Sequence, residues 1–257
     1  MTTRTSPRSR WARATIAGVT ALVVLGLAGC GDPPAESASN TSHARASTTT
    51  TVPSTTSTAA ATTTTTAPPT FTWRVTAIDA PLRTRMATSW HNGCPIAIDS
   101  LRYVSLVYWG FDGKAHMGEL VVNADAVGPL ERAFSSLFDQ RFPIRSMRLI
   151  DDFGGSDDQS MAADNTSAFN CRSVAGSSRW SQHAFGRAVD INPVENPYIH
   201  NGIIDPPAAV AFADRSAVRP GMLLPDSEAV AAFTAVGWGW GGSWSSPDHQ
   251  HVSATGS

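Results

Sequence analysis

Apolar residues recur in three segments of the chain, and their spacing predicts two strands and a helix. Residues 101–109 are rich in aliphatic and aromatic side chains, which predicts a strand, and residues 118–123 are its expected hairpin partner across the Asp112–Gly113 turn. Over residues 127–138 the apolar positions recur at helical spacing: Leu130, Phe134, Leu137 and Phe138. The first half of the folded region is therefore expected to pair a hairpin with a helix.

The second half contains shorter elements. Residues 188–191 are small and apolar and predict a short strand. Pro225 and Asp226 are expected to open a helix that carries Val230 and Phe233 and ends at Gly237. Because strands and helices do not alternate regularly, the pattern favours an α+β fold with a small antiparallel sheet flanked by helices, in a single domain.

The first 70 residues differ from the rest in composition. Residues 1–13 contain four arginines and no acid, residues 14–29 are uncharged and mostly apolar, and Leu27-Ala28-Gly29-Cys30 follows. This arrangement is typical of a bacterial secretory signal ending in a lipoprotein processing site, with a lipid carried on Cys30. A single membrane-spanning anchor is the alternative, but the apolar run is short against the roughly 20 residues that a span needs. We therefore expect residues 1–30 to be a signal peptide and the mature chain to be anchored to the outer face of the bacterial cell membrane.

Residues 31–70 are dominated by Thr, Ser, Ala and Pro, and such a segment cannot bury enough apolar surface to fold. We interpret it as a disordered linker and residues 71–257 as one domain. That domain contains 19 acidic and 14 basic residues, a formal charge of −5. An acidic domain of this kind is not expected to bind nucleic acid.

His183 and Asp190 stand seven residues apart around Gly186. In a helix they would lie about 10 Å apart, and in a strand about 23 Å, so neither geometry lets both hold one ion. The chain must bend between them, and Gly186 is the natural position for the bend. The sequence thus predicts a metal-binding loop.

A second cluster, Asp248-His249-Gln250-His251, lies near the C-terminus. If His251 binds the metal, Asp248 can stand beside it as the base that takes a proton from an activated water. His249 is a competing ligand, because in an extended segment it shares a face with His251. Together, the two clusters supply the metal ligands and the general base that a zinc hydrolase needs.

At these positions the chain resembles the D-alanyl-D-alanine carboxypeptidase family of zinc peptidases, which includes vancomycin-resistance D,D-carboxypeptidases and phage endolysins. The family pattern S-x-H-x-x-G-x-A-x-D, followed by a late acid three residues before a His, is complete here: Ser181, His183, Gly186, Ala188, Asp190, Asp248 and His251. The resemblance extends to residues 167–172 and 237–244 and to shorter matches at 89–95 and 111–113. One departure is Val252, where the family often has an aromatic residue.

The resemblance implies a role for each matched residue. His183, Asp190 and His251 are the implied zinc ligands, and Asp248 is the implied general base. Arg172 is implied to bind a substrate carboxylate or oxyanion, although a structural ion pair is the other interpretation; Ser181 is implied either to orient substrate or to shape its loop. The implied fold is that of the Hedgehog and D,D-peptidase type, a small sheet flanked by helices.

The single lysine excludes one competing enzyme class, and the remaining cysteines bear on another. With Cys30 assigned to lipid, Cys94 and Cys171 form an even pair in an exported domain, which suggests a disulfide. A catalytic thiol is the other reading, but neither cysteine follows the Ser-His-Gly motif of L,D-transpeptidases. Penicillin-binding serine enzymes need a Ser-x-x-Lys pair, and Phe111 stands three residues before Lys114, the only lysine.

We therefore expect an extracytoplasmic zinc peptidase that acts on peptidoglycan stem peptides, with D-Ala-D-Ala carboxypeptidase activity as the leading hypothesis. An endopeptidase of the same family and a catalytically silent wall-binding module are the alternatives; retention of Asp248 argues against the latter. Three tryptophans are expected either to line the substrate cleft or to fill the core: Trp238, Trp240 and Trp244.

Overall fold

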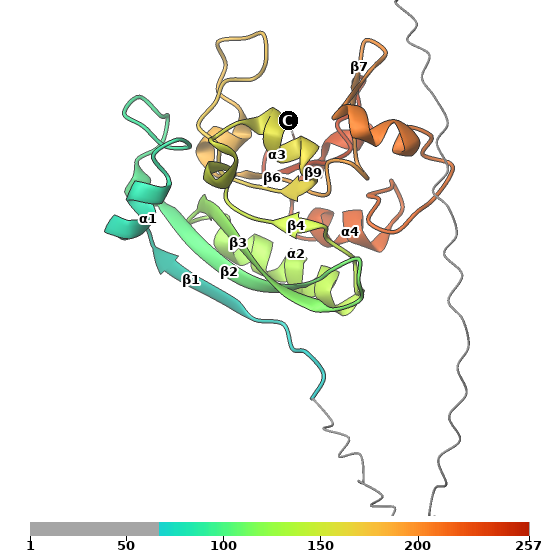
Figure 1. The fold of residues 1–257 in the computed structure, drawn as a ribbon, viewed down its shortest axis with the longest axis horizontal. Helices are drawn as coiled ribbons and strands as arrows, with labels where there is room; N and C mark the ends of the chain where they lie inside the picture. The colour runs from blue at the N-terminus through green and yellow to red at the C-terminus, as the bar shows by residue number, and fades with distance from the viewer. Residues whose placement is uncertain (1–66, 257) are drawn as a thin grey trace, which may run out of the picture. The chain divides into compact units, whose positions relative to one another are not determined.

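The computed structural model describes residues 67–256 (Figure 1). The predicted signal peptide, Cys30 and residues 31–66 of the predicted linker lie outside the described residues, while residues 67–70 are exposed and without regular structure. Among the residues described, no helix is both long and apolar enough to cross a membrane.

The first sheet has the order β1–β2–β3 and is antiparallel. Its strands are β1 (Trp73–Ala77), β2 (Leu101–Trp109) and β3 (Ala115–Asn123). The hairpin predicted from sequence is confirmed, with Leu101 opposite Asn123 and Trp109 opposite Ala115. The helix α1 (Ala80–Arg85) connects β1 to the loop that leads into β2.

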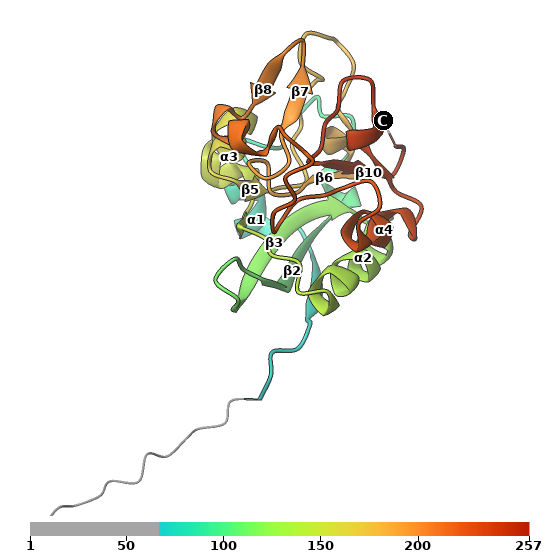
Figure 2. The same ribbon diagram turned by 90° about the vertical axis from the view of Figure 1, so that its right-hand side faces the viewer.

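Helix α2 (Val127–Asp139) confirms the predicted helical period and packs against this sheet. Its buried face includes Leu130, Phe134 and Leu137, which share one core cluster with Leu106 of β2 and Leu120 of β3. Helix α4 (Glu228–Thr234) lies beside α2, as Figure 2 shows.

The start of α4 differs from the prediction. The helix begins at Glu228 rather than at Pro225 and Asp226, because the Ser227 hydroxyl accepts a hydrogen bond from Val230 N at 3.2 Å and so forms the N-cap. Gly237, with φ +85°, follows the helix, where the chain turns toward β9.

The second sheet has the order β6–β10–β9 and is also antiparallel. Its strands are short: β6 (Ala188–Asp190), β10 (His251–Ser253) and β9 (Gly239–Trp240). A two-stranded antiparallel hairpin is formed by β7 (Tyr198–His200) and β8 (Ile203–Asp205). One pair departs from the antiparallel prediction, since β4 (Ser146–Met147) and β5 (Asn165–Thr166) run parallel.

The remaining helices are short and mostly serve as connections. Helix α3 (Asp157–Ala162) precedes β5, and its N-cap is Ser156, whose side chain accepts a hydrogen bond from Gln159 N at 3.3 Å. The 3₁₀ helices span Ile98–Ser100, Ile150–Phe153, Gln182–Phe185, Pro207–Phe212 and Gly241–Ser243. The described part is a mixed α+β fold with small, mainly antiparallel sheets, as the sequence predicted.

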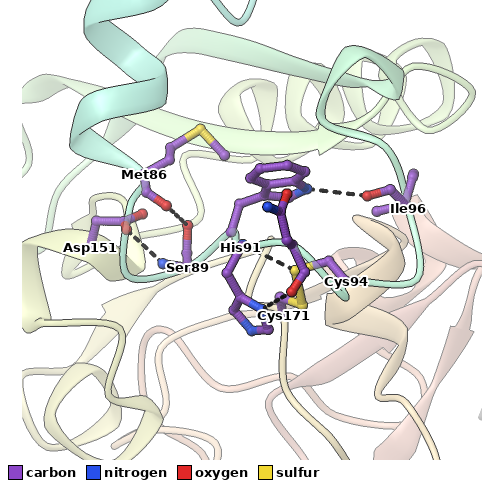
Figure 3. Close-up of a disulfide and its surroundings, with 9 residues drawn as sticks. Met86, Ser89, His91, Cys94, Ile96, Asp151 and Cys171 are labelled. Atoms are coloured by element: carbon purple, nitrogen blue, oxygen red, sulfur yellow. Dashed lines mark hydrogen bonds between the residues drawn. A yellow bond between two sulfur atoms is a disulfide. The ribbon is translucent and has the colours of Figure 1, made fainter.

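A disulfide joins Cys94 and Cys171, whose Cα atoms are 5.8 Å apart (Figure 3). It ties the loop after α1 to the segment that leads to Arg172. The same two segments are also connected by backbone, since Cys171 N donates to Ser89 O at 3.0 Å. In turn, Ser89 N donates to the Asp151 carboxylate at 2.8 Å. The N-terminal loop therefore braces the backbone on one side of the predicted site.

Candidate metal centre

His183 is held by a single 3₁₀ turn rather than by an irregular loop. Ser181 caps this turn, and its hydroxyl accepts a hydrogen bond from His183 N at 3.3 Å. Gly186 ends the turn with φ +65°, in the left-handed region that glycine adopts without strain. A Cβ atom at this position would lie 2.6 Å from Asn123 N, so the bend needs glycine for space as well as for conformation.

Asp190 and His251 come together through strand pairing. Asp190 is the last residue of β6, His251 is the first of β10, and the two are directly opposite in the antiparallel register. Opposite residues in such a pair place their Cβ atoms about 4.5–5.5 Å apart, on the same face of the sheet. The bend at Gly186 then carries His183 to that face.

The three side chains converge on one point. His183 Nε2 lies 3.2 Å from His251 Nδ1 and 3.1 Å from Asp190 Oδ2, and His251 Nδ1 lies 3.0 Å from Asp190 Oδ1. Ligands bound at about 2.0–2.1 Å around a tetrahedral ion are roughly 3.3–3.4 Å apart, so these separations need only small adjustments. All three residues are buried, with exposed fractions between 2% and 7%.

The environment fixes the histidine orientation that metal binding needs. His183 Nδ1 donates to the carbonyl of Ala168 at 2.6 Å, which leaves the Nε2 lone pair directed at the other two side chains. Outer contacts of this kind set the tautomer and ring orientation of metal-binding histidines. Two nitrogens and a carboxylate form a donor set that suits zinc.

The electrostatics of the cluster favour an ionised carboxylate beside at least one neutral imidazole. Burial alone would raise the pKa of Asp190, but the charge and hydrogen bonds of His183 and His251 hold that pKa well below its usual range. Burial lowers the pKa of His251. Burial also opposes protonation of His183, but the adjacent Asp190 carboxylate outweighs it and raises the His183 pKa. The Asp190 carboxylate thus carries a negative charge. A metal cation can neutralise this charge in place of a proton.

Asp248 stands next to this cluster without joining the set of three. Its side chain is half-buried, and its Oδ1 atom is buried without a hydrogen-bond partner among the described residues. Burial, followed by repulsion from Asp190, raises the pKa of Asp248 to about 8. A buried carboxylate oxygen without a protein partner can take a proton or contact a ligand, which makes Asp248 a candidate functional residue.

Asp248 and the three candidate metal ligands line a cleft of about 400 Å³. Arg172 and Ser181 also line it. Arg172 forms an ion pair with Asp157 at 2.7 Å, while its Nε atom is buried and has no hydrogen-bond partner within residues 67–256. The guanidinium is therefore both structurally paired and present at the cleft, and Ser181 shapes the turn that carries His183.

The tryptophans divide between the two expected roles. Trp238 and Trp240 belong to the hydrophobic core. Trp244 lines the cleft, with its ring centroid 5.3 Å from that of His251.

His249, the competing ligand in the sequence, lies outside the cluster of three. Its carbonyl accepts a hydrogen bond from Trp240 Nε1 at 2.8 Å, and its ring lies against the Trp240 ring. His91, Cys94 and Cys171 are also close enough to share an ion. The disulfide removes both thiolates from that group, so it provides no second metal site in the oxidised chain.

Several residues of the cleft were not singled out from the sequence. Gln250 lines it, as do Tyr198, His200 and Asp205 of the β7–β8 hairpin. The Asn201-Gly202 pair between the two strands is a strong hairpin signal that could have placed this wall. Asp157 carried no comparable signal, because its partner Arg172 is distant in sequence.

A buried His–Asp–His cluster, next to a carboxylate with one buried oxygen that has no partner among the described residues, defines a candidate metal-dependent hydrolase on an α+β fold. Residues 175–254 match the family model described as D-alanyl-D-alanine carboxypeptidase, and this range includes His183, Asp190, Asp248 and His251. This segment of the chain is therefore similar to D-alanyl-D-alanine carboxypeptidases. Comparison with curated proteins and with solved structures gave no match.

Proposed function

We propose that the chain is a zinc-dependent peptidase that hydrolyses peptidoglycan stem peptides and removes the terminal residue of a D-Ala-D-Ala end. The observation that carries this proposal is the convergence of three ligand atoms, about 3 Å from one another, beside the free carboxylate oxygen of Asp248. A site that only stabilised the fold would have no use for a buried carboxylate without a partner.

His183, Asp190 and His251 would hold the ion through Nε2, a carboxylate oxygen and Nδ1. When bound, zinc with three protein ligands polarises a carbonyl and lowers the pKa of a water molecule toward about 7. The positive charge of the ion also favours the ionised form of Asp248, whose pKa is otherwise raised to about 8. Asp248 can then act as a base near neutral pH.

The chain's own residues account for the proton movements of peptide hydrolysis. Asp248 accepts a proton from the attacking water as the carbon–oxygen bond forms. It donates that proton to the leaving amine as the carbon–nitrogen bond breaks. Arg172, held in place by Asp157, contributes positive charge at the cleft for a substrate carboxylate or for the developing oxyanion.

The location of the activity is part of the proposal. The arginine-rich and apolar N-terminal run, Cys30 and the Thr-rich segment support export, a lipid anchor on the outer face of the membrane, and a tether that lets the domain reach the cell wall. An exported, acidic peptidase next to the wall has stem peptides as its nearest substrates.

The test is mass spectrometry of purified muropeptides, both pentapeptide monomers and cross-linked dimers, after incubation with the zinc-loaded full chain. We expect the loss of one alanine from each stem, and no loss with chain treated with a chelator. Halved cross-linked dimers would instead assign an endopeptidase. Unchanged muropeptides would contradict the proposal and favour a binding module.

A further inference from the structure

One end of the cleft is acidic. Asp158 of α3 and Asp205 of β8 both line it, and each lies close enough to the other for their charges to interact. Asp157, the residue before Asp158, instead pairs with Arg172. Helix α3 therefore presents one carboxylate to the basic side of the cleft and the next to the β7–β8 hairpin.

The two sides are built from separate parts of the fold. Figure 1 shows the gold loop of residues 172–180 and the orange β7–β8 hairpin rising on different sides of α3. The loop supplies Arg172 and Arg179 to the cleft, and the hairpin supplies Asp205. The cleft therefore has a basic wall and an acidic wall. The three candidate metal ligands also face this cleft.

Gln250 gives an independent indication that the acidic end receives a ligand. Its exposed fraction is 2%, it lines the cleft, and its Oε1 atom has no hydrogen-bond partner among the described residues. Its Nε2 atom contacts Met161 Sδ at 3.3 Å, which places the amide against α3, the helix that carries Asp158. A thioether is a weak acceptor, so neither end of this amide is well satisfied by the protein alone.

A second polar atom nearby is also without a partner. His200 Nδ1 is buried and has no hydrogen-bond partner in the described part of the chain, and the His200 ring stacks on Tyr198 with centroids 4.6 Å apart. This end of the cleft thus combines two carboxylates, an amide oxygen and an imidazole nitrogen. A ligand that suits these acceptors carries positive charge and several N–H donors.

We propose that Asp158, Asp205 and Gln250 form a subsite for an ammonium group of the peptide substrate. The inference rests on the proposed function and names its substrate class, peptides that carry a free amine near the cleaved bond. An ammonium group has three donors, which match two carboxylates and one amide oxygen. Arg172 and Arg179, on the basic wall, would repel the amine and so fix the direction in which the peptide lies.

The test compares peptides that differ only in their amines. A diamino-acid stem pentapeptide, its side-chain N-acetyl form and its N-terminal acetyl form are each assayed with the zinc-loaded full chain. Turnover and calorimetric binding are measured in parallel. For the native chain we expect acetylation of one of the two amines to lower kcat/KM at least tenfold, since charge-assisted hydrogen bonds are among the strongest polar contacts. The amine whose acetylation has this effect is the one that the subsite binds.

The matched variants are the double change Asp158→Asn with Asp205→Asn, and Asp226→Asn as a control. Asp226 is exposed and lies outside the cleft, so its variant removes a charge without touching the subsite. In the double variant the preference for the free amine should fall to within about twofold, while Asp226→Asn should keep it. Retention of the full preference in the double variant, or equal cleavage of all three peptides by the native chain, would overturn the proposal.

The binding measurements distinguish failure of this subsite from failure of the proposed peptidase function. If no peptide is cleaved but the free-amine peptide still binds more tightly, and the double variant abolishes that difference, then the subsite stands and the peptidase assignment fails. If calcium binds the native chain without peptide and not the double variant, the acidic end is a cation site and the inference is wrong.

Discussion

At the residue scale, the proposed hydrolysis depends on two acids with separate roles, Asp190 and Asp248. Asp190 is surrounded by two histidines and keeps a low pKa, while Asp248 is half-buried and has its pKa raised to about 8. Two carboxylates whose surroundings push their pKa values apart are a common basis for dividing binding from acid–base work. This difference supports the proposal that Asp190 binds the metal and Asp248 transfers the proton.

Replacing Asp248 by Asn tests this division. The amide has nearly the same shape but cannot take a proton, so zinc binding should persist while kcat/KM falls about 10²–10⁴-fold. Metal content and peptide turnover measured on the same preparation check both halves. Asp226→Asn serves as the control and should be indistinguishable from the native chain. Native turnover in Asp248→Asn would show that the base lies elsewhere.

At the scale of elements, the site depends on a tight bend as much as on its ligands. Gly186 combines a positive φ with close backbone approach, because its carbonyl accepts from Asn123 N at 2.8 Å. The bend therefore attaches the His183 turn to the end of β3.

Gly186→Ala should destabilise the fold by at least about 2 kcal/mol, since a left-handed alanine costs roughly 1–2 kcal/mol and the contact with Asn123 adds to it. Gly202→Ala is the matched control. Gly202 also has a positive φ, of +77°, but a Cβ there meets no atom within 4 Å. Urea unfolding of both variants checks the difference, and zinc affinity should drop only in the first. Equal losses of stability would mean that the bend is not under steric constraint.

Elements with a clear period were predictable from the sequence, whereas those fixed by distant contacts were not. The β2–β3 hairpin and α2 follow from local apolar spacing and turn residues. The predicted start of α4 at Pro225 and Asp226 was wrong, because Ser227 provides the N-cap and the helix begins after it. The Arg172–Asp157 ion pair and the cleft position of Gln250 depend on tertiary packing, which no local pattern encodes.

At the scale of the whole molecule, the three candidate ligands come from the second half of the described residues, and the N-terminal part of the domain supports them. The Cys94–Cys171 disulfide joins two residues that are 77 positions apart in the sequence, and Cys171 directly precedes Arg172. In the chain-entropy model such a loop contributes about 4–4.5 kcal/mol. The family match begins at residue 175, so the disulfide and Arg172 lie outside it.

The N-terminal segment gives the proposal its cellular setting. Cys30→Ala should abolish labelling by a fatty-acid probe and leave the chain unprocessed or released, because the proposed anchor attaches lipid to this thiol. Cys94→Ala should retain labelling, since Cys94 is in the folded domain. Normal lipid labelling of the Cys30 variant would refute the anchor.

The central claim is that His183, Asp190 and His251 together bind one zinc ion. Native mass spectrometry of the full chain after equilibration with zinc tests it most directly. We expect one zinc per chain, which is lost in His183→Ala and in Asp190→Ala but kept in His249→Gln, because a site with three protein ligands holds metal poorly with two. Full zinc occupancy in both the His183 and the Asp190 variants would contradict the account.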